Sequence, residues 1–358
     1  MDRRERRLRG FVILAVATSM LTLIALFAYS FSTQREDLID SLTRLDPLVF
    51  LIAIGLHLGA LGFWAVRLML LADGCGHPLA FRRAMSGVLA SVFVAALTPA
   101  RLGGEPVRFA VLTSAGTPPR EASLMGLLER ALDNALFIVL GTVATSVLLP
   151  QLPEAALLGV VLPLGILFLV LLIVFPLLVL FKPRVLHPFM HLAKRFVGEE
   201  RLEHAKERVV LEGGRFRRAL GTVLARKPSR VPLAALATTL SWALEFGVIA
   251  YLLYAFGHDV PFTYVALGAV IVVLLTTLPL LPGGSGLAEL GALGIFSPVA
   301  PGLTPAFVLV WRVTTYYVDT IVGGLFAVRF AGAETRRVLT RKRRPDEVAR
   351  AVVEGDRP

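Results

Sequence analysis

The feature that most constrains this chain is a stretch of 27 residues, 155–181, without a single charged side chain. A helix needs about 20 mostly apolar residues to cross the hydrocarbon core of a bilayer, so this stretch is long enough to span a membrane. The remainder of the chain agrees, because 56% of its 358 residues are hydrophobic and the mean hydropathy is +0.72. We therefore expect an all-α integral membrane protein.

The net charge of +11 is concentrated in three segments. Residues 1–10 and 331–358 each carry a net charge of +3, and residues 182–230 carry +8. Basic residues collect on the cytoplasmic side of membrane proteins, so this pattern is a signal of topology rather than of nucleic-acid binding. It predicts a multi-pass protein of the cytoplasmic membrane with a basic cytoplasmic N-terminus, a basic cytoplasmic loop, a basic cytoplasmic tail and both termini inside.

Two segments leave an alternative open. Residues 11–31 are predicted as the first span; a cleaved signal peptide is the rival interpretation, but 21 apolar residues exceed a usual signal core and no clear cleavage site follows. The loop 182–230 is either an amphipathic surface helix on anionic headgroups or a solvated connector.

A polar segment, residues 98–108, interrupts apolar sequence and contains two arginines, a glutamate and a Gly-Gly pair. The apolar stretches on either side, 84–97 and 106–114, are each too short to cross a bilayer as a helix. Irregular backbone at membrane depth is tolerated only within protein or around a cavity. These features predict a re-entrant helical hairpin that enters from the cytoplasm.

The second half of the chain repeats this pattern with the opposite orientation. Residues 262–281 lead to a glycine-rich segment and the short stretch 290–296, and the connection 297–305 that follows is uncharged, as expected outside the cell. About six full spans and two opposed hairpins then satisfy every charged connection. We predict a membrane domain, 11–330, in which 47–149 and 231–330 form an inverted repeat.

The two halves also share local spacing. Trp64-Ala65-Val66-Arg67 in the first half corresponds to Trp242-Ala243-Leu244-Glu245 in the second. Glu105 precedes Arg130 by 25 residues, and Glu289 precedes Arg312 by 23. Inverted repeats place a binding site near the midplane, between broken helices.

The expected substrate site combines the charged and glycine residues of both hairpins with those of the helices that follow them. It consists of Arg101, Gly103, Gly104, Glu105, Arg108, Glu129, Arg130, Asp133, Gly283, Gly284, Ser285, Gly286, Glu289, Arg312 and Asp319. Helix starts with free N–H groups bind anions, and arginine forks match a phosphate. The alternative is that the glycines only permit close helix packing.

The carboxylates also leave two interpretations open. Glu105 and Glu289 fall in the first turns of short helices, where they complement the helix dipole; they could equally neutralise an arginine or carry a proton. Arg130 and Asp133 could form a pair within one helix. His57, Arg67 and Glu245 are weaker candidates for the site.

No catalytic, metal or cofactor site is expected. The single cysteine, Cys75, excludes a disulfide framework, and the six histidines are scattered. No nucleotide-binding motif occurs.

At three motifs the chain resembles the transmembrane, flippase-like region of the lysylphosphatidylglycerol synthase family. They are Thr98-Pro99 with Gly104-Glu105 and Arg108; Leu128-Glu129-Arg130 with Asp133; and Leu281-Pro282-Gly283-Gly284-Ser285-Gly286 with Glu289. The resemblance implies a protein that moves a phosphate-bearing lipid between leaflets. Two-domain members carry a large aminoacyl-transfer domain, whereas 28 residues follow the membrane domain here, so aminoacylation is not expected.

The expected partner is therefore an anionic phospholipid or a polyprenyl-phosphate lipid, moved without chemical change. Two other functions stay open: a membrane-embedded transferase acting on a lipid phosphate, and an ion-coupled transporter of a small anion. The sequence leaves open the identity of the cargo, the energy coupling and the oligomeric state.

Overall fold

The structure, a computed structural model, describes residues 46–98, 101, 103–148, 214, 221, 223, 225–276 and 286–329. Throughout these residues the regular structure is helical, without a strand. The predicted spans 11–31 and 155–181, most of the loop 182–230 and the tail 331–358 lie outside the described residues.

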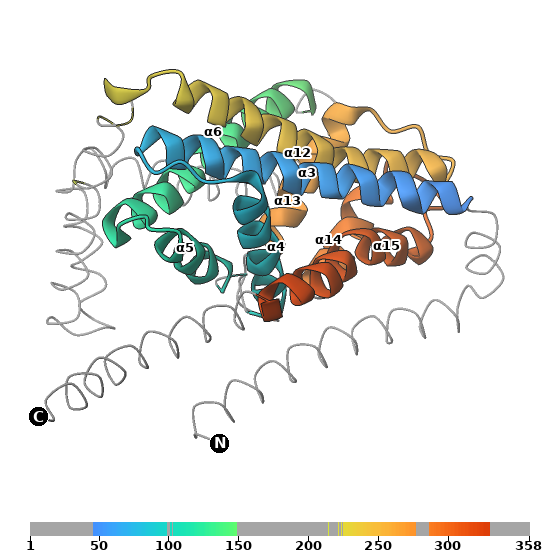
Figure 1. Cartoon of the computed structure of the whole chain (residues 1–358). Coiled ribbons are helices and arrows are strands. Elements are labelled where there is room, and N and C mark those ends of the chain that lie inside the picture. Colours follow the sequence, from blue (N-terminus) through green and yellow to red (C-terminus); the bar gives the residue numbers. More distant parts are fainter. Residues whose placement is uncertain are drawn as a thin grey trace, which may run out of the picture.

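Two long helices form the centre of the fold (Figure 1). Helix α3 (Pro47–Gly74) begins where Asp46 accepts a hydrogen bond from the Leu48 amide, with proline at the first helical position. Helix α12 (Arg230–Ala255) lies beside α3 in the opposite direction, because Lys227, just before α12, contacts Asp73 at the end of α3. Within the described residues, these two helices are long and apolar enough to cross a membrane.

The first half of the chain continues as a helical hairpin. Helices α4 (Phe81–Leu97) and α5 (Gly104–Ser114) pack together, and α6 (Pro119–Leu148) follows α5 (Figure 1). Helices α4 and α5 begin three and two residues earlier than the predicted apolar segments 84–97 and 106–114, because helices extend into polar first turns that a hydropathy pattern does not include.

The second half also contains two short helices before its last long one. Helices α13 (Phe262–Thr276) and α14 (Leu287–Phe296) pack against each other. Helix α15 (Pro305–Arg312) then runs into a π-helical turn, η5 (Val313–Tyr317), and the chain continues as α-helix through 318–329. A π-turn carries an additional residue in its turn and is frequent at functional sites.

The buried apolar side chains form two cores. One is built mainly from the second half and includes Phe246, Phe296 and Phe307. The other is built mainly from the first half and includes Leu68 and Met125. Some of the polar contacts described next join helices of the two halves, and others lie within one half.

Candidate functional site

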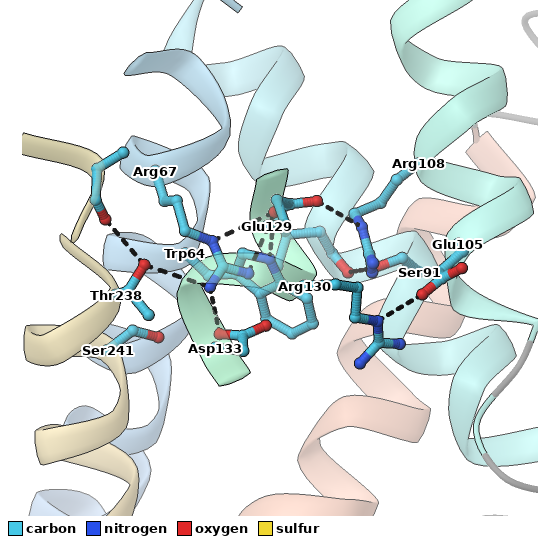
Figure 2. Close-up of polar contacts among 12 residues, drawn as sticks. Trp64, Arg67, Ser91, Glu105, Arg108, Glu129, Arg130, Asp133, Thr238 and Ser241 are labelled. Atoms are coloured by element: carbon cyan, nitrogen blue, oxygen red, sulfur yellow. Dashed lines mark hydrogen bonds and ion pairs between the residues drawn. The ribbon is translucent and has the colours of Figure 1, made fainter. Parts of the chain in front are cut away.

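Two carboxylates of α6 collect hydrogen bonds from both central helices (Figure 2). Glu129 accepts from the Trp64 indole at 2.9 Å and from Arg67 Nη2 at 3.1 Å. Asp133 accepts from Arg67 Nη1 at 2.5 Å and from the Trp242 indole at 2.9 Å. Trp64 and Trp242, which occupy matching positions in the two halves of the sequence, therefore each donate an indole N–H to a carboxylate on neighbouring turns of α6.

Arg108 of α5 joins this network from the other side of Glu129 (Figure 2). Its Nε lies 3.2 Å from Glu129 Oε2, its Nη1 donates to Ser91 Oγ at 3.2 Å, and its guanidinium lies 5.0 Å from the centre of the Trp64 ring. Arg67 and Glu129 are almost fully buried. Two arginines and two carboxylates balance in charge, which such burial requires.

The first half also places an ion pair at the start of α5. Arg130 Nε donates to Glu105 Oε1 at 2.6 Å. The Arg130 and Glu105 side chains are 56% and 48% exposed, so this ion pair is accessible from the surface of the protein. The alternative prediction, a pair between Arg130 and Asp133 within α6, is not what the structure shows, because Asp133 contacts Arg67 while Arg130 reaches α5.

The second half contains a matching ion pair at the start of α14. Arg312 Nε donates to Glu289 Oε1 at 2.8 Å, and the other oxygen of Glu289 accepts the Gly286 amide at 2.6 Å. Gly286 has φ 83°, a left-handed conformation that favours glycine. This pair is buried, with side-chain exposures of 6% for Arg312 and 3% for Glu289.

Tyrosines of the π-turn surround the buried pair. The Arg312 guanidinium lies 4.5 Å from the centre of the Tyr316 ring, and the Tyr316 hydroxyl donates to Ala96 O of α4 at 3.1 Å. The Tyr317 hydroxyl is buried without a hydrogen-bond partner in the described part of the chain, and it lies close enough to Arg312 and Glu289 for electrostatic interaction. A buried polar atom without a partner calls for an explanation, such as a bound ligand.

A third cluster joins three helices around a buried histidine. His57 Nδ1 lies 2.9 Å from Glu245 Oε2, and His57 Nε2 lies 3.0 Å from Asp319 Oδ1. Arg101, in the α4–α5 connection, lies within electrostatic range of Glu245. Its φ of 56° is a left-handed conformation that a residue with a side chain rarely adopts, which marks strained backbone.

The glycines of the first hairpin stand where α5 approaches α4. A Cβ on Gly103 would lie 2.7 Å from Thr98 Cγ2, and a Cβ on Gly104 would lie 3.0 Å from the Ser91 carbonyl oxygen. Both glycines are therefore required for close packing, and the Gly103 amide donates to Thr98 Oγ1 at 2.9 Å. Gly283, Gly284 and Ser285 of the second motif lie outside the described residues.

The contacts among the predicted site residues join them into separate groups. Arg108, Glu129 and Asp133 form one group, Glu105 with Arg130 and Glu289 with Arg312 form two pairs, and Asp319 belongs to the histidine cluster. His57, Arg67 and Glu245, the weaker candidates, also belong to these groups, and so do three residues outside the expected site, Trp64, Trp242 and Tyr317. Their partners lie on helices that are distant in the sequence. The sequence feature that could have indicated Trp64 and Trp242 is the motif that the two halves share.

No metal centre emerges from the part of the chain that the structure describes. Within it, no group of three or more His, Cys, Asp or Glu side chains is arranged to hold a metal ion. The charged side chains of the groups described above are instead paired with one another.

The fold and these paired charges define an all-helical membrane protein. The chain belongs to the family described as the lysylphosphatidylglycerol synthase transmembrane region, whose model matches residues 12–323, and this confirms the resemblance of the three motifs. Three archaeal relatives are each named a UPF0104 membrane protein. The relative from Archaeoglobus fulgidus is 29% identical over 86% of this chain and 94% of its own length. Those from Methanothermobacter thermautotrophicus and Pyrococcus horikoshii are 26% and 22% identical, over 90% and 86% of this chain and 97% and 94% of their own lengths.

Proposed function

We propose that this protein moves a phosphate-bearing lipid between the leaflets of the cytoplasmic membrane, without changing it chemically. The cargo class is an anionic phospholipid or a polyprenyl-phosphate lipid. The observation that carries the proposal is the pair of matching ion pairs, Glu105–Arg130 and Glu289–Arg312.

Each pair is a place where a phosphate can replace a carboxylate. In both, the glutamate belongs to the first turn of a short helix and the arginine donates through Nε. A lipid phosphate in place of the glutamate would meet the same arginine and, at α14, the Gly286 amide that Glu289 now accepts. The glutamate neutralises the arginine while the site is empty, and for the buried Arg312 this avoids an unpaired charge inside the protein.

The Tyr317 hydroxyl supports a ligand beside the second pair. It is buried near Arg312 and Glu289 and finds no acceptor among the described residues. A phosphate oxygen bound to Arg312 would supply that acceptor. The exposed first pair and the buried second pair then correspond to a site open at one hairpin and closed at the other.

We further propose the inverted repeat, with about six spans and hairpins entering from opposite faces. The two matched ion pairs and the equivalent roles of Trp64 and Trp242 support it. Repeats of this kind place the site midway between leaflets, where a headgroup must pass.

Cysteine labelling in intact cells tests this topology. We expect Arg120→Cys, after the first hairpin, to react with impermeant maleimide only in inverted membranes, and Ser297→Cys, after the second, in right-side-out cells. Both residues are exposed. Burial raises the pKa of the native Cys75 thiol to about 11, so this cysteine adds little background. Labelling of both variants from the same side would contradict the inverted repeat.

Chain length tests whether the cargo is a lipid. A buried acyl chain contributes about 0.8 kcal/mol per methylene, so phosphatidylglycerol with 16-carbon chains should bind far more tightly than the same headgroup on six-carbon chains. The measurement is equilibrium binding to the purified protein, with mass spectrometry of the recovered lipid. Equal affinity would favour a transporter of small anions, and a chemically altered lipid would favour a transferase.

A further inference from the structure

The cluster around His57 has a geometry that fixes its proton count. Both ring nitrogens of His57 contact a carboxylate oxygen, Nδ1 that of Glu245 and Nε2 that of Asp319. A neutral imidazole has one N–H and can donate to only one of them. The other contact would place a nitrogen lone pair against a carboxylate. The arrangement is satisfied only when it holds one additional proton, on the ring or on a carboxyl group.

The charges at the cluster itself favour the same proton. Two carboxylates, those of Glu245 and Asp319, contact His57, and one cation, Arg101, lies within electrostatic range of Glu245. One further proton makes this group neutral. The groups that face His57 from the elements packed around α3 are Glu245 of α12, Asp319 of the helix 318–329 and, beside Glu245, Arg101.

The proton also determines which helices stay joined. With the proton present, α3 is held to α12 through Glu245 and to 318–329 through Asp319. Loss of the proton removes one of these two contacts. Asp319 lies seven residues after Arg312, with the π-turn η5 between them. A movement of 318–329 therefore acts on the same continuous helix that carries the arginine of the buried ion pair.

We propose that His57, Glu245 and Asp319 form a proton-binding site that couples lipid movement to a proton gradient. The proton enters the cluster from one side, is shared between the imidazole and the two carboxylates, and leaves to the other side when 318–329 moves. Chains of His, Asp and Glu in membrane transporters serve as proton relays. The inference rests on the proposed lipid transport and names its energy source.

Proteoliposomes separate coupling from transport itself. The probe is phosphatidylglycerol with an NBD group on one acyl chain, and dithionite reports the fraction in the outer leaflet. Without a gradient, we expect the wild-type protein to bring the probe to an even distribution faster than empty vesicles. With one pH unit across the bilayer, the leaflet ratio should shift by about tenfold for each coupled proton. Trapped pyranine should report the matching proton flow.

The variants then assign the effect to the cluster. His57→Gln should still equilibrate the probe, but its leaflet ratio should stay even when the gradient is imposed. Glu245→Gln and Asp319→Asn, which preserve side-chain shape, provide the same test if His57→Gln does not fold. The matched control is His77→Gln, since His77 contacts Glu121 in a half-exposed pair outside the cluster and should respond as the wild type does.

Other outcomes would overturn the inference. If the wild-type protein equilibrates the probe but ignores the pH gradient, or responds to a sodium gradient instead, the proton site is wrong and the lipid transport stands. If all three cluster variants keep the wild-type response, coupling lies elsewhere. If the wild-type protein does not move the probe under any gradient, the proposed function fails and the inference with it.

Discussion

Replacing Glu129 with alanine is expected to destabilise the protein by about 3–5 kcal/mol, the usual cost of breaking a buried ion pair. Glu129 is 2% exposed and is the shared acceptor of Trp64 and Arg67 and the ion-pair partner of Arg108. Without it, two arginines stay buried with Asp133 as the remaining carboxylate of the group. The loss of stability would be measured by heating the purified protein in detergent and using size-exclusion chromatography to determine the fraction that stays folded.

The control for this variant is Glu105→Ala. Glu105 is also a glutamate paired with an arginine, but its side chain is 48% exposed and its partner can remain solvated, so the melting temperature should change little. A second variant, Glu129→Gln, keeps the size and removes the charge, and it should lose most of the stability that the alanine variant loses. Wild-type stability in both Glu129 variants would show that the network does not hold α6 in place.

Replacing Arg130 with alanine is expected to slow lipid movement by about ten- to a hundredfold while the protein stays folded, the loss expected for a hydrogen bond to a charged group. Arg130 is 56% exposed, so its removal leaves no buried charge unpaired. Arg130→Lys should recover little of the rate, since an ammonium does not reproduce the two-pronged contact of a guanidinium with phosphate. The measurement is the initial rate of probe redistribution in proteoliposomes.

Arg120→Ala is the matched control for Arg130. Arg120 is exposed, lies ten residues earlier in the same helix and has no place in the proposed site, so its rate should equal that of the wild type. If the Arg130 and Arg120 variants behave alike, the exposed ion pair is not where phosphate binds. Arg312→Ala is a poorer test, because Arg312 is 5% exposed and its removal would strand Glu289.

The sequence predicted those parts of the structure that are local or repeated. The boundaries of the short helices agree within a few residues, because the apolar stretches and the polar interruption are continuous in the chain. The two Glu–Arg spacings of 25 and 23 residues correspond to two ion pairs in the structure. A residue spacing that occurs in both halves of the chain is easier to detect than one that occurs once.

The contacts that occur once could not be predicted. Arg67 was only a weaker candidate for the site from its sequence position, but it is 3% exposed and contacts Glu129, 62 residues later, and Asp133. His57 meets Asp319, 262 residues later. Spacing along one helix gives no information on which distant helix will face it. An isolated histidine or arginine in apolar sequence therefore gives a weak signal until the packing is known.

The antiparallel pairing of α3 and α12 also has a consequence for how the protein is made. A ribosome that adds 5 to 20 residues each second needs about 10 to 40 seconds to synthesise the 188 residues between His57 and Glu245. During that time His57 has neither Glu245 nor Asp319 to contact. Synthesis of the 62 residues from Arg67 to Glu129 takes about 3 to 12 seconds at the same rate. We therefore expect proteases and chaperones of the membrane to act on this chain in the interval after the first half is made and before the second half is complete.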